Sequence, residues 1–472
     1  MYSLSLRYAC FLSAVLWSAG ACAQAPAPTA EQQQLRSIYK ELVEINTTDS
    51  VGSCTDAVTA MAARLKAAGY RDSEMQMIVP PDSPKKGNLV VRLKGSGEKK
   101  PLLLLAHVDV VEAKREDWVR DPFKLIEVNG VFYARGASDD KAMAASYVQN
   151  MIRYKREGFA GKRDIILALT CDEEIIPSKF NGVAYLLKHH RNLIDAEFAI
   201  NEGGGGVLDK NEKPVSMTLH AGEKVYQSYQ LEVTSPGGHS ARAPRDNAIY
   251  HLAEGLARLG KFDFPFTLSP TTRAYYQRLS RIETGQTAAD MQAILQDPPD
   301  LQAMERLYTR NPEYNSAVRT TCVATMVDAG HATNALAQRA RAVLNCRVLP
   351  GESVDAVRAT LVRVLADERI KISPVGEPQL SPPPPLTPAI VDAVERSAAE
   401  IWPGVPVVPA LFVASSDGAM LNNAGIWTYG ASGMFVGVEG SGAHGLNEHL
   451  RVKSLYNSVD FLYRLGKRLA LD

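Results

Sequence analysis

The sequence predicts an α/β protein in which a mixed-sheet domain is interrupted by an inserted, ferredoxin-like α+β domain. Three observations favour this fold. Before about residue 224, short apolar runs of strand length alternate with helical segments. The pattern then changes to the order βαββαβ, which is the ferredoxin-like arrangement. Four consecutive prolines, Pro382–Pro385, follow, and such a run is a stiff spacer through which the chain can return to the first domain.

Residues 24–223 form the first part of the predicted sheet domain, and residues 381–472 form its second part. A capping box at Thr29 and Gln32 predicts a helix through Glu44, and a second helix is expected at Val58–Ala68. The strands are almost continuously apolar, which indicates burial on both faces. They are expected at Asn88–Leu93, Leu102–Ala106, Ile165–Leu169 and Phe198–Ile200, with helices at Lys141–Arg156 and Gly182–His190.

The inserted domain is expected at residues 224–380. Its predicted strands are Tyr226–Val233, Thr321–Val327, Ala340–Val348 and Ile370–Ser373, and its helices are Ala248–Leu259 and Ser353–Ala366. A polar, helix-rich insertion at about residues 265–316 interrupts this order. Its Pro298-Pro299 pair predicts at least two helical pieces.

The N-terminal residues 1–23 resemble a secretory signal peptide. Arg7 is followed by an apolar run at 8–19 and by Ala21-Cys22-Ala23, a small-x-small cleavage site. We therefore expect an exported protein, periplasmic or secreted. Lipid attachment at Cys22 is less favoured, because no large aliphatic residue precedes it. The run is shorter than the roughly 20 residues that a membrane span needs, and no other stretch is long enough to span.

Charge and cysteine content exclude several classes of protein. Lysine plus arginine and aspartate plus glutamate both number 52, which gives no support for a nucleic-acid or anionic-membrane partner. The cysteines after residue 23 form no CxxC pair, so a thiolate metal site is not expected. Cys322 and Cys346 lie in strands that we expect to pair, and we predict a disulfide between them. The alternative is two buried free thiols.

Five motifs contain residues suited to metal chemistry. They are His107-Val108-Asp109, Ser138-Asp139-Asp140-Lys141, Asp172-Glu173-Glu174, Asn201-Glu202-Gly203 and the segment 441–448 with His444. Each has an ordinary explanation when taken alone, such as a buried histidine, a helix cap or a solvated loop. However, three of them follow apolar strands, where open α/β sheets bind ligands. Histidine and carboxylate donors without thiolates suit zinc and, less selectively, cobalt or manganese.

The order of these motifs resembles the metallopeptidase family of aminoacylase, carnosinase, bacterial glutamate carboxypeptidase and succinyl-diaminopimelate desuccinylase. The resemblance covers nearly the whole chain after residue 23. In the inserted domain it includes the segments 235–241, 333–335 and 345–351. Two small departures are Ala106 and Ala142, at positions where the family commonly has glycine.

The resemblance implies a site with two Zn²⁺ ions, with Co²⁺ or Mn²⁺ as substitutes. His107, Asp139 and Glu202 would bind one ion, and Glu174 and His444 the other, with Asp139 bridging both. Asp109 would orient His107, and Glu173 would act as general base. In the inserted domain, His239 would stabilise the oxyanion, while Asn334 and Arg347 would hold the substrate. A structural salt bridge is the alternative role for Arg347.

The expected function is hydrolysis of an amide bond in a small peptide, as in a carboxypeptidase or dipeptidase. The alternatives are deacylation of an N-acyl amino acid, a catalytically silent binding protein on the same fold, and a metal store. By resemblance, the inserted domain would serve as a lid and mediate a homodimer, with His239 reaching the partner subunit's metal site. The rival is a monomer in which the helical insertion covers that surface.

Overall fold

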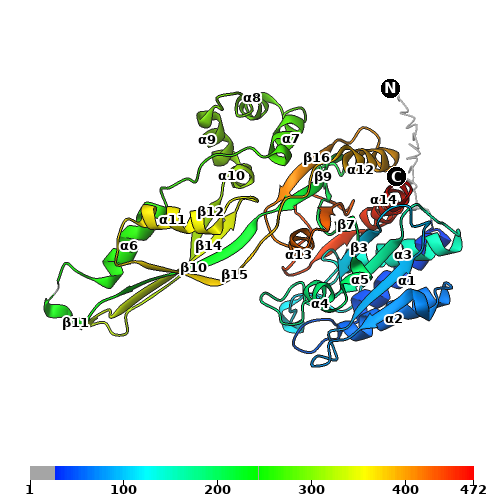
Figure 1. The fold of residues 1–472 in the computed structure, drawn as a ribbon, viewed down its shortest axis with the longest axis horizontal. Coiled ribbons are helices and arrows are strands. Elements are labelled where there is room, and N and C mark those ends of the chain that lie inside the picture. The colour runs from blue at the N-terminus through cyan, green and yellow to red at the C-terminus, as the bar shows by residue number, and fades with distance from the viewer. Residues whose placement is uncertain (1–26, 243) are drawn as a thin grey trace, which may run out of the picture.

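The computed structural model describes residues 27–242 and 244–472 (Figure 1). The expected signal peptide, its cleavage site and Cys22 lie outside the described residues. Among the described residues, none of the helices combines the length and the apolar character that crossing a membrane requires.

The central sheet contains ten strands. Their direction is mixed, as predicted. Four neighbouring strands in its middle are parallel, in the order β6 (Ile165–Thr170), β3 (Leu102–His107), β7 (Phe198–Asn201) and β17 (Trp427–Gly430). β2 (Asn88–Leu93) and β1 (Met75–Ile78) extend one side in antiparallel fashion. The other side contains β9 (Pro214–Glu223), β8 (Gly206–Leu208), β18 (Phe435–Val436) and β16 (Val407–Phe412). Strands from both sides of the inserted segment therefore build one sheet.

Helices cover both faces of the central sheet, which explains the continuously apolar strands. Along β3, Leu102 and Leu104 belong to one core while Leu103 and Leu105 belong to another, because successive side chains point to opposite faces. The larger core packs against α1 (Ala30–Glu44), α2 (Cys54–Ala67), α3 (Lys141–Arg156), α12 (Pro388–Ile401) and α14 (Val452–Leu471). The smaller core packs against α4 (Gly182–His189), α5 (Arg191–Ile194) and α13 (Gly418–Asn423).

The second sheet has the ferredoxin-like strand order. It runs β12 (Thr321–Ala329), β14 (Arg339–Val348), β10 (Val225–Thr234) and β15 (Lys371–Gln379), with every neighbouring pair antiparallel. Helices α6 (Ala248–Leu259) and α11 (Val354–Leu365) close a core of its own on one face. The chain enters this sheet directly after β9 and leaves it before β16. We keep residues 224–380 as the proposed limits of the inserted domain.

The helical insertion forms a separate small core. It consists of α7 (Pro270–Leu279), α8 (Gly285–Ala293), α9 (Leu301–Arg310) and α10 (Pro312–Val318). Figure 1 shows α7, α8 and α9 standing beside the junction of the two sheets. The expectation of at least two helical pieces is confirmed, with four short helices observed.

Two element boundaries differ from the sequence prediction for identifiable reasons. α2 begins at Cys54 rather than Val58, because the Ser53 side chain accepts a hydrogen bond from the Asp56 N–H and caps the helix there. β15 continues to Gln379, although it contains Pro374 and Pro378. Proline is tolerated in it because β15 is an edge strand.

The structure contains two disulfides among its described residues. Cys322 and Cys346 are directly opposed in β12 and β14 and are bonded, which confirms that prediction. Cys54 and Cys171 form a second bond, which the sequence did not predict. It joins the first residue of α2 to the residue that follows β6 across 117 positions of sequence.

Candidate active site

The first histidine of the site lies at the end of the central strand β3. Its Nδ1 is 3.1 Å from the carbonyl oxygen of Asp109 and 3.5 Å from the Asp109 carboxylate. Its Nε2 is thereby left facing two carboxylates, 3.1 Å from Asp139 Oδ1 and 3.8 Å from Glu202 Oε2. Glu202 follows β7, the parallel neighbour of β3, so the sheet itself brings these groups together.

A second cluster shares Asp139 with the first. His444 Nε2 is 3.2 Å from Asp139 Oδ2 and 2.9 Å from Glu174 Oε2. Asp139 therefore presents one carboxylate oxygen to each histidine. Within each cluster the candidate donor atoms all lie within 4.8 Å of one another. The structure thus brings together all five residues that the sequence analysis proposed as metal ligands.

The donor set fits two divalent metal ions. The clusters contain imidazole nitrogens and carboxylate oxygens, with a single carboxylate between them, which suits zinc-type coordination. Carboxylates surround both histidines. Burial lowers the pKa of His107, but Asp109, Asp139 and Glu202 outweigh burial and raise this pKa well above its ordinary value. Hydrogen bonds to Asp139 and Glu174 raise the pKa of His444 to about 10. The excess of negative charge that favours protons on these rings equally favours cations.

Glu173 lies between the buried Asp172 and the ligand candidate Glu174. Burial, followed by the charge of Glu202, raises the pKa of the Glu173 carboxyl well above its ordinary value. A carboxylate with a raised pKa next to metal-ligand candidates is suited to accept a proton. Glu174 is held differently, because its backbone N–H donates a 3.0 Å hydrogen bond to Asp109 Oδ2.

A buried carboxylate that the sequence analysis did not single out supports Asp139. Glu448 is fully buried and accepts hydrogen bonds from the N–H groups of Gly136, Ser138 and Asp139, at 3.0, 2.7 and 3.0 Å. It also pairs with the buried Arg135 at 2.8 Å. The sequence feature that could have drawn attention to Glu448 is its position four residues after His444. The helix-cap explanation for the Asp139-Asp140 pair is not supported, because Asp140 makes no side-chain capping bond to α3.

Two of the three candidates in the inserted domain, His239 and Asn334, lie together and far from the metal clusters. His239 is exposed in β11 (Gly238–His239), which pairs with β13 (Ala335–Leu336) next to the exposed Asn334. Figure 1 shows β11 at the outer tip of the inserted domain, at the opposite end from β3 and β7. Arg347 lies at the other end of β14, where its guanidinium lies 4.7 Å from the centre of the Tyr226 ring. In the described residues Arg347 is paired with no carboxylate, so the salt-bridge alternative is not observed.

An α/β sheet with two histidine–carboxylate clusters beyond its parallel strands defines a metallopeptidase-type hydrolase. The chain belongs to peptidase family M20/M25/M40, which matches residues 103–468. It is 28% identical over 376 residues to the Mus musculus N-fatty-acyl-amino acid synthase/hydrolase PM20D1, covering 77% of this chain and 73% of that protein. It is also 28% identical over 395 residues to the Dictyostelium discoideum probable carboxypeptidase S-like 2, covering 80% and 74% of the two chains.

Solved structures share the fold at low sequence identity. The M20 family metallo-carboxypeptidase Sso-CP2 of Sulfolobus solfataricus aligns with a TM-score of 0.68 at 19% identity, covering 93% of this chain and 99% of that one. Human carnosine dipeptidase 1 aligns with a TM-score of 0.61 at 16% identity, covering 93% and 97%. A Bacillus subtilis protein described as a dinuclear metal-binding M20 peptidase aligns at 0.59 and 14% identity, covering 93% and 98%.

Proposed function

We propose that this protein is an exported dinuclear zinc hydrolase that cleaves the amide bond of a small peptide, in the manner of a carboxypeptidase or dipeptidase. The observation that carries the proposal is the division of Asp139 between two clusters, with one oxygen 3.1 Å from His107 and the other 3.2 Å from His444. His107, Asp139 and Glu202 would hold one ion, and Asp139, Glu174 and His444 the other. When bound, such ions supply Lewis acidity to a scissile carbonyl and lower the pKa of a nearby water.

The protein's own groups would move the proton and hold the substrate. Glu173 accepts a proton from the attacking water and delivers it to the leaving nitrogen, so that the amide gives a carboxylate and an amine. Asp109 keeps His107 oriented through its Nδ1. Arg347 suits a substrate carboxylate, because its planar guanidinium binds such a group with two hydrogen bonds.

Hydrolysis of N-acyl amino acids is the second candidate function. It is favoured by the likeness to relatives named N-fatty-acyl-amino acid synthase/hydrolase, which covers 77% of this chain. Both candidates share the same bond cleavage and differ only in the group on the acyl side.

A substrate panel distinguishes the two candidates. The purified protein, loaded with zinc, is given dipeptides, N-acetyl amino acids and long-chain N-acyl amino acids, and release of the free amine is measured. The proposal expects dipeptides to give the highest kcat/KM. A preference for long-chain N-acyl amino acids would contradict the peptidase proposal and favour the second candidate function. No amine release from any member would contradict both.

The inserted domain offers a surface for a homodimer. β12 is an edge strand of the small sheet, and it exposes Val323, Met326 and Val327 by 60%, 67% and 63%. Exposed apolar residues on an unpaired edge favour pairing with a second copy. We propose that two chains associate here and that His239 of each enters the other's metal site, because it lies far from its own (Figure 1).

A further inference from the structure

The segment that carries Glu173 and Glu174 has no regular secondary structure of its own. It connects β6, which ends at Thr170, to α4, which begins at Gly182, and Asp172 adopts a left-handed conformation with φ of 62°. A loop without backbone pairing of its own is placed by its side-chain and covalent anchors. The anchors of this loop therefore decide where the proposed general base and a proposed ligand stand.

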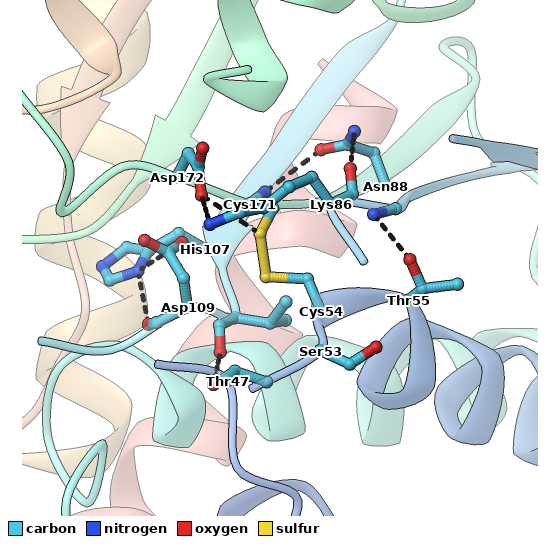
Figure 2. Close-up of a disulfide and its surroundings, with 12 residues drawn as sticks. Thr47, Ser53, Cys54, Thr55, Lys86, Asn88, His107, Asp109, Cys171 and Asp172 are labelled. Carbon is cyan, nitrogen blue, oxygen red and sulfur yellow. Dashed lines mark hydrogen bonds and ion pairs between the residues drawn. A yellow bond between two sulfur atoms is a disulfide. The ribbon is translucent and has the colours of Figure 1, made fainter. Parts of the chain in front are cut away.

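Several anchors converge on the start of the loop (Figure 2). The Cys171 N–H donates to Asn88 Oδ1 at 3.1 Å, and the Gly182 N–H donates to the Cys171 carbonyl at 2.7 Å. The buried Asp172 carboxylate pairs with Lys86 and accepts a 2.7 Å hydrogen bond from the Ser178 hydroxyl. The only covalent anchor among the described contacts of this loop is the bond from Cys171 to Cys54 at the start of α2.

The disulfide also lies against Asp109, which is a member of neither metal cluster but contacts a residue of each. A carboxylate oxygen of Asp109 lies within 4.8 Å of both sulfurs. Asp109 Oδ1 is 3.5 Å from His107 in the first cluster, and Asp109 Oδ2 accepts the Glu174 N–H in the second. Asp109 Oδ1 is buried and makes only the 3.5 Å contact with His107 Nδ1, so the packing around Asp109, the disulfide included, also limits its position.

We infer that the Cys54–Cys171 disulfide is a positioning clamp for both clusters, so that full activity requires this pair to be oxidised. The inference rests on the proposed function. Cys54 is 2% exposed and Cys171 is 0% exposed, so an external reductant reaches the bond only when the structure around it opens locally. The clamp is therefore set during folding. Two thiols and a small-molecule disulfide give the protein disulfide and two small-molecule thiols, with protons and electrons balanced.

The test compares two double variants that each remove one disulfide and leave no free thiolate to compete for zinc. Cys54→Ala/Cys171→Ala removes the clamp. Cys322→Ala/Cys346→Ala is the matched control, because it removes the disulfide of the inserted sheet. We expect the clamp variant to lose on the order of tenfold to a hundredfold in kcat, because small displacements of reacting groups are costly. Its KM should change little, and it should retain fewer than two zinc ions after dialysis. The control should keep its kcat within about twofold and both ions.

A second measurement covers the case in which the clamp variant does not fold. The wild-type protein is warmed in zinc buffer with a water-soluble trialkylphosphine, which becomes the phosphine oxide by taking oxygen from water while both sulfurs become thiols. The thiols that form are labelled, and the labelled peptides identify which disulfide has opened. Fluorescence of the protein reports unfolding. Activity should fall in step with opening of Cys54–Cys171 and before global unfolding.

Two results would overturn the clamp. One is a folded clamp variant with kcat within about twofold of the control and two bound ions. The other is full activity in wild-type protein whose Cys54 and Cys171 are thiols. Failure of the proposed function is recognised separately, because the wild-type protein would then release no amine, while zinc retention would still report on the clamp.

Discussion

Glu173 and Glu174 are adjacent in sequence, yet their surroundings differ. Glu174 reaches the second cluster through His444 and is fixed by its backbone bond to Asp109. Glu173 has no such partner in the cluster and is distinguished by burial and by the neighbouring charge of Glu202, which raise its pKa. We therefore propose Glu174 as a metal ligand and Glu173 as the general base.

Replacing these two carboxylates by amides should therefore have different effects. Glu173→Gln keeps the side chain's shape but removes the basic oxygen, so kcat should fall on the order of 10²-fold or more with two metal ions retained. Glu174→Gln is the matched control and should lose metal from the second cluster. Steady-state kinetics and metal analysis of both variants check this. A nearly normal kcat for Glu173→Gln would show that another group is the base.

At the level of single residues, sequence reasoning located the side chains that follow strands but not those that support them. His107 and Glu202 were predictable because parallel strands end at one edge of a sheet. The pairing of Glu448 with Arg135, or of Lys86 with Asp172, joins positions far apart in the chain. No periodicity or local motif marks such a partner, because the contact exists only after the elements have packed.

At the level of elements, the segment before α3 depends on one buried carboxylate. Glu448 satisfies three backbone N–H groups there and neutralises the buried Arg135.

The prediction of α3 at Lys141–Arg156 was confirmed to the residue, whereas β15 was predicted too short. The periodicity of a helix is visible in its own sequence. A proline-containing edge strand such as β15 is recognised only from its pairing with a neighbouring strand.

Removing the Glu448 carboxylate should destabilise the protein strongly. Glu448→Ala leaves an uncompensated buried charge on Arg135 and three unsatisfied N–H groups, at a cost of about 3–5 kcal/mol in the free energy of unfolding. Glu448→Gln keeps an acceptor in place and should cost less. Denaturant unfolding of both variants measures the difference. A loss below about 1 kcal/mol for Glu448→Ala would contradict this role.

At the level of the whole molecule, residues from both sides of the inserted segment assemble the proposed metal site. His107, Asp139, Glu174 and Glu202 precede the inserted segment, and His444 follows it. We expect dialysis against a chelator to abolish hydrolysis and zinc to restore it, with two ions per chain at full activity. Full activity at zero metal content would refute the proposed mechanism.

The distance of β11 from the metal clusters leads to a test of shared active sites. His239→Ala and Glu173→Gln are each expected to be nearly inactive alone. In a mixed dimer built in trans, one of the two sites holds both intact residues. After complete exchange of equal amounts, about a quarter of wild-type activity should return, because half of the dimers are mixed.

This experiment needs proof that subunits exchange, for example by differently labelled chains. Exchange without recovery of activity would exclude the trans arrangement. A fully active monomer in light scattering would exclude it as well, and would leave His239 with either an intramolecular or a structural role.

The place of β17 in the central sheet governs the order in which the chain can fold during synthesis. β17 lies between β7 and β9, yet it is made after the whole of residues 224–380. The early strands therefore lack the strand that belongs between β7 and β9. The ferredoxin-like sheet, although made later, forms from residues of its own segment alone. Domains usually fold in the order of synthesis. Here the central sheet is begun first but completed last, so the proposed metal site, which needs His444, stays unfinished until late in synthesis.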